Sequence, residues 1–280
     1  MIRIPGFVDA HVHIESSHLL PEEFGKLLLR HGTTAAICDP HEIVNVSGEE
    51  GLRFMLENAK KSPCDLYFEL PSCIPATGFE TSGAVLTAKD TAELFDRYPE
   101  LIGLGEMMNV PGVLEGDAEV LAKINAAKSR RKIIEGHFPG GSGEALYRYA
   151  ATGITSDHES LTREEALEKV SCGQTVFLRE GSAAKNLTET IGAVTRENAD
   201  FFCFCADDIS ASDLLDGGDI LRCVKLAVKL GMDTALALKI ACDNPRRYFR
   251  LPNDETTYVL LDETRDFEIV KVVKNGREFR

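Results

Sequence analysis

The sequence lacks the features that would direct it to a membrane, to nucleic acid or to an oxidising compartment. It contains no apolar run of about 18 residues, the length that a transmembrane helix needs, and no basic, apolar leader follows Met1. It has no stripe of Lys and Arg. The net charge of -14, from 45 acidic against 31 basic residues, also opposes nucleic acid or an anionic membrane as the main partner. The eight cysteines form no CxxC pair, so we expect reduced, buried thiols and a cytoplasmic location.

Short apolar, β-rich segments are what the sequence does have, and seven of the eight end in a polar residue. The eight segments are FVDAH (7–11), TAAICD (34–39), DLYFEL (65–70), LIGLGE (101–106), KIIEGH (132–137), GITSDH (153–158), TVFLRE (175–180) and FFCFCAD (201–207). Their apolar character on both faces is typical of parallel strands, and helical patterns separate them. No GxGxxG follows the first segment, which disfavours a dinucleotide-binding sheet. Residues 1–250 are therefore predicted to form an α/β fold, a (β/α)8 TIM-type barrel.

Two segments interrupt this alternation. Residues 71–86 are rich in Gly, Pro, Ser and Thr, and we expect a lid or substrate loop there. Residues 251–280 alternate like strands joined by turns, with Asn275-Gly276 as a tight-turn signal. The sequence thus predicts a small C-terminal β appendage after the barrel.

Polar residues at the ends of the predicted strands are the candidates for an active site, because barrel enzymes build their sites at that end. His11 and His13 lie two apart in an extended segment, so both side chains leave the same face and can reach one cation. A hydrogen-bonded structural pair is the alternative for HxH alone. His137, His158 and Asp207 at the ends of later strands favour a metal centre, since the chain has only seven histidines.

Two carboxylates complete the predicted centre. Glu106 ends its apolar segment at the same face, where it can bridge two cations, and the alternative is a lone acid facing solvent. Asp207 follows the run FFCFCA, which would bury it without compensation unless it were paired or bound to metal. An aspartate in such a place can accept a proton from water and deliver it to a leaving group.

Further residues are predicted to contact the substrate or to support the metal ligands. They are Glu15, Ser16, His41, Glu42, Arg179 and Ser182. His41 is equally suited to be a ligand, a substrate contact or a hydrogen bonder that orders its loop. Arg179 and Glu180 can orient a polar substrate, and an internal salt bridge explains them equally well. Glu15 and Ser16 are candidates because the second ring nitrogen of a ligating imidazole needs a partner.

The motifs taken together resemble the adenine deaminase family of the amidohydrolase superfamily. The resemblance is carried by PGFVDAHVHIESS, ICDPHEIVNVSG, PSCIPATGFETSGA, GLGEMMNVPGV, EGHFPG, SDHES, REGSAAKNL and CADD, across most of residues 4–250. It implies two divalent metal ions, manganese or iron with zinc as a further option, held by His11, His13, Glu106, His137, His158 and Asp207. The implied reaction converts adenine and water to hypoxanthine and ammonia, with Asp207 moving the proton and Glu180 protonating or holding the ring. A purine base as substrate and a homo-oligomer are implied as well.

The sequence departs from that family after the paired aspartates. Family members typically carry a basic residue there, often with a histidine, where this chain has Ile209, Ser210 and Ala211. A later Gly-His-Ile-Asp-like segment is replaced by residues 218–221, Gly-Asp-Ile-Leu. Two alternatives therefore stand beside adenine deamination. One is an amidohydrolase acting on another cyclic amide or amidine, and the other is a catalytically degenerate paralogue that still binds metal.

Overall fold

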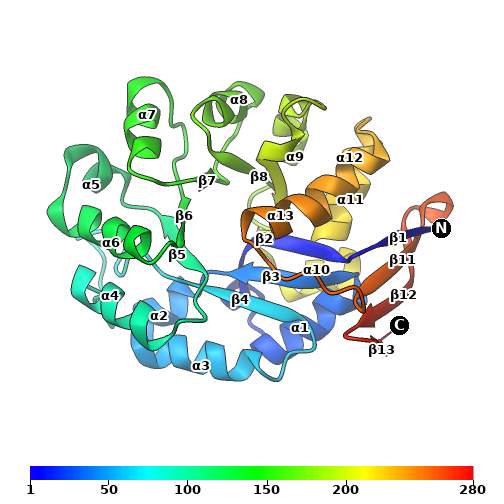
Figure 1. The fold of residues 1–280 in the computed structure, drawn as a ribbon, viewed down its shortest axis with the longest axis horizontal. Helices are drawn as coiled ribbons and strands as arrows, with labels where there is room; N and C mark the ends of the chain where they lie inside the picture. The colour runs from blue at the N-terminus through cyan, green and yellow to red at the C-terminus, as the bar shows by residue number, and fades with distance from the viewer. Residues whose placement is uncertain (280) are drawn as a thin grey trace.

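Eight parallel strands close around a common axis in the computed structural model, which describes residues 1–279 (Figure 1). They are β2 (Phe7–His13), β3 (Thr33–Cys38), β4 (Asp65–Leu70), β5 (Gly103–Met107), β6 (Ile133–Gly136), β7 (Ser156–Asp157), β8 (Thr175–Arg179) and β9 (Phe202–Cys205). Every predicted strand segment overlaps one of them, and the predicted (β/α)8 barrel is confirmed.

The strands follow one another around the barrel in chain order. One sheet has the strand order β10-β2-β3-β4-β5-β6 and a second has the order β7-β8-β9. Strand β10 (Asp207–Asp208) follows β9 directly along the chain. The amide of Thr155 donates to the carbonyl of Ile134 at 3.0 Å and links the β6 and β7 segments. The amide of Ala206 donates to Oδ1 of Asp9 at 3.0 Å, and β10 pairs with β2 in parallel. The carboxyl ends of all eight strands therefore open on the same face.

Helices cover the outside of the barrel (Figure 1). They are α1 (Pro21–Arg30), α2 (His41–Ser47), α3 (Glu49–Ala59), α4 (Ala88–Arg97), α5 (Val110–Glu115), α6 (Ala118–Ser129), α7 (Gly143–Ala151), α8 (Arg163–Ser171), α9 (Leu187–Thr190), α10 (Ala211–Gly217), α11 (Ile220–Lys229), α12 (Thr234–Leu238) and α13 (Asn244–Tyr248). Local chemistry starts several of them. Thr87 and Asp90 form a capping box at α4, and the Thr162 hydroxyl accepts from the Glu165 amide at α8. Helices α2, α5 and α10 were not predicted, because at six or seven residues each they are too short to show a helical period.

A four-stranded antiparallel sheet lies beside the barrel near both termini (Figure 1). Its order is β1 (Ile2–Ile4), β11 (Tyr258–Asp262), β12 (Glu268–Lys274) and β13 (Arg277–Glu278). Asn275 and Gly276 join β12 to β13 with φ values of 53° and 74°, as a tight hairpin turn requires. Because β1 belongs to this sheet, the N-terminal residues contribute to the appendage as well. The division into 1–250 and 251–280 stays a prediction.

Below its polar mouth, the barrel interior combines an apolar cluster with buried carboxylates. Phe177 on β8 and Phe249 after α13 belong to a buried cluster with Ile37, Cys203 and Cys205. The loop over residues 71–86 has neither helix nor strand, and its role as a lid stays a prediction. Across residues 1–279, none of the helices is both long and apolar enough to cross a lipid bilayer.

Candidate metal centre

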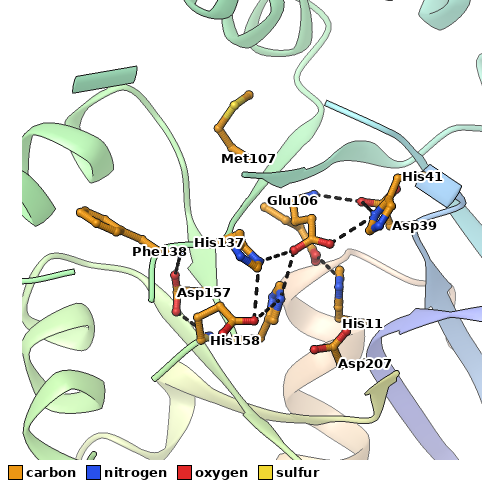
Figure 2. A network of polar contacts seen from close by, with 12 residues as sticks. His11, Asp39, His41, Glu106, Met107, His137, Phe138, Asp157, His158 and Asp207 are labelled. Carbon is orange, nitrogen blue, oxygen red and sulfur yellow. Dashed lines mark hydrogen bonds and ion pairs between the residues drawn. The ribbon is translucent and has the colours of Figure 1, made fainter. Parts of the chain in front are cut away.

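The six predicted metal ligands lie together at the carboxyl ends of the strands, and all except His13 are labelled in Figure 2. They come from β2 (His11 and His13), β5 (Glu106), the residue after β6 (His137), the residue after β7 (His158) and β10 (Asp207). Five of them are buried, while His137 keeps 29% of its side chain exposed. The barrel places them together because each parallel strand ends at the same rim.

Glu106 lies at the centre of the cluster, and each of its two carboxylate oxygens contacts a different pair of imidazoles. Oε1 lies 3.3 Å from Nε2 of His13 and 3.3 Å from Nδ1 of His41. Oε2 lies 2.6 Å from Nδ1 of His137 and 3.2 Å from Nε2 of His158. A carboxylate between two groups of nitrogen donors is the arrangement that a bridging ligand needs.

The two histidines of β2 direct their Nε2 atoms into the same space. These atoms are 3.1 Å apart. Nδ1 of His11 lies 2.7 Å from Oε2 of Glu135, and Nδ1 of His13 donates to the carbonyl of Asp39 at 2.9 Å. With the Nδ1 atoms held by acceptors, the Nε2 lone pairs are available to a cation, as in most histidine metal sites. The His11 ring also stacks on the His158 ring at 4.2 Å.

The donor atoms fit divalent cations. Three groups of buried or half-buried side chains each hold donor atoms within 4.8 Å of one another: His11 with His158 and Asp207, His11 with His13 and Glu106, and Glu106 with His137 and His158. Within residues 1–279, Nδ1 of His158 is buried and has no hydrogen-bond partner. Imidazole and carboxylate donors together suit manganese, iron or zinc.

Asp207 is held by Arg179, which also holds Glu159. Nη1 of Arg179 lies 2.6 Å from Oδ2 of Asp207. The same guanidinium binds the Glu159 carboxylate through both of its terminal nitrogens, with Nη2 donating to Oε2 at 3.0 Å. Oδ1 of Asp207 lies 3.1 Å from Nε2 of His13. Asp207 has a φ of 59°, a left-handed conformation that is uncommon for residues other than glycine and recurs at functional sites.

The imidazoles set the charge state of the carboxylates. Burial by itself would raise the pKa of Glu106, but hydrogen bonds from His13, His137 and His158 hold that pKa well below its usual value. The pKa of Asp207 is lowered as well, because the hydrogen bond from His13 and the nearby imidazoles outweigh burial. The pKa of His13 is raised well above its usual value, since Asp207 and Glu106 outweigh its own burial. The two carboxylates are therefore ionised and need positive charge beside them.

His41 and Glu42, at the start of α2, lie at the edge of the cluster. The His41 ring lies 4.5 Å from the His13 ring, and its pKa is about 9 because the interactions with Asp39 outweigh its burial. Glu42 is half-exposed and its Oε1 lies 3.6 Å from Nε2 of His41. Contact of these two residues with a substrate stays a prediction.

Glu15 and Ser16 support the loops around the cluster. Among residues 1–279, neither side chain forms a hydrogen bond with Glu106 or with the four histidines of the predicted ligand set. Oε1 of Glu15 accepts from the amide of Ile43 at 3.3 Å, which ties the segment after β2 to α2. The Ser16 hydroxyl donates to the carboxylate of Asp208. Burial and the charge of Glu42 raise the pKa of Glu15 to about 7.

Glu180 and Ser182 lie beside the cluster and face other partners. Glu180 follows Arg179 along the chain, so its side chain points the other way. The charges that act on it most strongly are those of Arg222 and Lys185. Burial raises the pKa of Glu180. The Ser182 hydroxyl donates to Asp213 and accepts from the amide of Ser210 at 2.9 Å. A catalytic role for Glu180 stays a prediction.

Sequence reasoning missed two glutamates beneath the cluster and one beside it. Glu135 contacts His11, and Glu69 lies next to Glu135 in the barrel interior, with neither side chain exposed. Burial and the charge of Glu135 raise the pKa of Glu69 well above its usual value. Glu159 directly follows His158. The available signal was a charged residue inside an apolar strand segment, as in DLYFEL and KIIEGH, because such a residue needs a buried partner.

Comparison with known proteins agrees with this geometry. The sequence pattern of the amidohydrolase family matches residues 2–278. The adenine deaminase of Thermosipho africanus (strain TCF52B) is 44% identical over 285 residues, covering 99% of this chain and 50% of that protein. The adenine deaminase of Thermosipho melanesiensis is 46% identical over 282 residues, with coverages of 98% and 49%. The chain thus spans about half the length of the curated relatives it matches.

Solved structures resemble the fold at low sequence identity. N-acetyl-D-glucosamine-6-phosphate deacetylase from Mycobacterium smegmatis superposes with a TM-score of 0.72 at 17% identity, covering 99% of this chain and 86% of that one. A β-aspartyl dipeptidase from Fervidobacterium islandicum AW-1 gives 0.67 at 19% identity, with coverages of 99% and 84%. The barrel, its converging ligands and the match over residues 2–278 together show that the chain belongs to the amidohydrolase family.

Proposed function

We propose that this protein is a metal-dependent hydrolytic deaminase that converts adenine and water to hypoxanthine and ammonia. The observation that carries the proposal is the carboxylate of Glu106, whose two oxygens face two separate sets of imidazoles. The choice of adenine rests on the curated adenine deaminases, which are 42–46% identical over nearly the whole of this chain.

We propose two divalent ions, manganese or iron, with zinc as a further option. His11, His13, Glu106, His137, His158 and Asp207 would hold them. Such ions lower the pKa of bound water and so make a nucleophile available at neutral pH. The donor set, with its four imidazoles and two ionised carboxylates, supports this assignment.

Asp207 and a second acidic side chain would carry out the proton transfers of this reaction. Asp207 is ionised, so it can accept a proton from the attacking water and deliver it to the leaving amino group as ammonia forms. Arg179 fixes the orientation of the Asp207 carboxylate through Oδ2 and leaves Oδ1 toward His13. A second acid is needed at the ring. The sequence favours Glu180 for that role, whereas the position of Glu159, within 3.4 Å of His158, favours Glu159.

Another cyclic amide or amidine is the second candidate substrate, because the chain departs from the adenine deaminase pattern at residues 209–221. Part of that segment serves the scaffold. Asp219 is fully buried and accepts from the hydroxyl of Thr33 at 2.6 Å, while Ser210 caps α10. The basic and histidine groups expected there are replaced by residues that make internal contacts.

The deciding experiment measures ammonia release and the absorbance change of adenine in protein loaded anaerobically with iron or manganese. We expect metal-dependent conversion to hypoxanthine, and we expect the Asp207→Asn variant to be slower by about 10²- to 10⁴-fold. Protein that holds two ions and leaves adenine unchanged would instead point to the other cyclic substrates. A panel of cyclic amides and amidines then identifies which one is turned over.

A cytoplasmic location and a homo-oligomer are proposed as well. All eight cysteines are free thiols, and seven of them are buried, which suits a reducing compartment. The assembly is implied by the resemblance to adenine deaminases, and light scattering of the purified protein tests it.

A further inference from the structure

A buried ion pair lies beside the proposed centre and contains none of its ligands. Asp157 at the end of β7 and Lys169 on α8 have no exposed side-chain surface, and Nζ of Lys169 donates to Oδ1 of Asp157. A fully buried pair is costly to desolvate and is poor evidence of stability by itself. Its contacts therefore need another explanation.

The pair binds both main-chain polar groups of Phe138, the residue directly after His137. The amide of Phe138 donates to Oδ2 of Asp157 at 2.7 Å, as Figure 2 shows, and its carbonyl accepts from Nζ of Lys169 at 3.0 Å. Oδ1 of Asp157 also accepts from the amide of Glu159 at 2.8 Å. One charge pair thus holds the backbone next to His137 and on both sides of His158.

The loop that carries His137 needs such support because its own sequence is flexible. Residues 136–143 contain four glycines and one proline. Besides the pair, Tyr149 on α7 contacts this segment. Its hydroxyl accepts from the amide of His137 at 3.0 Å and donates to the carbonyl of Met107 at 2.8 Å. His137 is also the most exposed of the six proposed ligands, so its backbone largely determines where its ring lies.

We propose that Asp157 and Lys169 are positioning residues that control occupancy of the cation position formed by Glu106, His137 and His158. The inference rests on the proposed two-metal function. Neither side chain would itself ligate an ion. The pair holds the His137 and His158 main chains so that their rings and the Oε2 atom of Glu106 converge. Groups that support metal ligands in this way typically change metal affinity by about 10- to 100-fold when they are removed.

The test is a titration of the metal-free protein, residues 1–280, with Mn²⁺. Electron paramagnetic resonance measures the concentration of free Mn²⁺ at each step. The variants are Lys169→Met and the double change Asp157→Asn with Lys169→Met, which leaves no unpaired buried charge. The control is Lys274→Met. Lys274 is also buried, at 5% exposure, and pairs with Asp65 at 2.5 Å, but it lies on β12, in the antiparallel sheet.

We expect two ions in the unaltered protein, and about 10- to 100-fold weaker binding of one of them in both pair variants. The second ion should bind unchanged, and Lys274→Met should keep both affinities even where its melting temperature falls. Pair variants that bind both ions with unaltered affinity, while melting at lower temperature like the control, would show a purely structural role and overturn the inference. Unaltered protein that binds no Mn²⁺ would overturn the proposed function along with it.

Discussion

The guanidinium of Arg179 contacts the carboxylate of Asp207, with 2.6 Å between Nη1 and Oδ2, and it also donates hydrogen bonds to Glu159. One buried cation therefore orients two carboxylates at the mouth of the barrel. The planar guanidinium can do this because it presents several donors in fixed directions, whereas an ammonium group is a point charge.

Arg179→Lys should lower the turnover number by about 10- to 100-fold, because lysine cannot hold Asp207 and Glu159 together. The comparison is made at saturating metal, so that a change in metal affinity through Asp207 does not contribute to the loss. Steady-state kinetics on metal-analysed protein measures the change. Arg222→Lys is the matched control, since Arg222 donates to the carbonyl of Glu180 at 2.7 Å and lysine can replace that bond. Equal losses in the two variants would contradict a special role for Arg179.

Glu159→Gln and Glu180→Gln separate the two candidates for the second acid. The position of Glu159 beside His158 and Arg179 predicts a loss of about 10²-fold or more in turnover for Glu159→Gln. The surroundings of Glu180, where Arg222 and Lys185 are the charges that act on it most strongly, predict a change of less than about threefold. Turnover numbers of both variants under saturating substrate decide the matter. A large loss only in Glu180→Gln would support the prediction made from the sequence.

Bound metal should stabilise the fold through the bridging position of Glu106. At a free Mn²⁺ concentration of about 100 times the dissociation constant, each site adds about 2.7 kcal/mol to the free energy of unfolding. Denaturant unfolding with and without a chelator measures this difference. Glu106→Gln should remove most of it, since an amide is a poor bridge between cations. Glu100→Gln, at an exposed glutamate, should keep it, and an unchanged gain in Glu106→Gln would rule out the bridging role.

Glu69 should make the metal-free protein less stable as the pH rises. Its pKa is raised well above the usual value by burial and by Glu135, so the folded state keeps a proton that the unfolded state releases. The free energy of unfolding therefore falls as pH rises from about 4.3 through the raised pKa, by at most about 1.4 kcal/mol per pH unit.

Glu69→Gln removes that titration, so urea unfolding of metal-free protein between about pH 5 and pH 9 should show a shallower decline. An exposed site serves as the reference, and Glu57→Gln should leave the slope unchanged. Identical slopes for Glu69→Gln and the unaltered protein would show that Glu69 does not carry the effect.

Much of the centre was predictable because strand endings are readable in sequence. Seven of the eight apolar segments end in a polar residue, and residues two apart in a strand share a face. Local pattern alone therefore identifies His11, His13 and Glu106 as candidates. The direction in which the Glu180 side chain points was harder to predict from the sequence. Arg179 and Glu180 end the same segment, and only the observed strand shows that the first faces Asp207 and the second faces away.

The sequence by itself determined the alternation of strands and helices and the identity of the six proposed ligands, because hydrophobic periodicity is a local property of the chain. Only the tertiary structure decided which groups support them. His11 contacts Glu135 across 124 residues of chain, Arg179 joins Asp207 across 28, and Lys169 reaches Phe138 across 31. These contacts exist because the barrel closes, and no local pattern records which side chains that closure brings together.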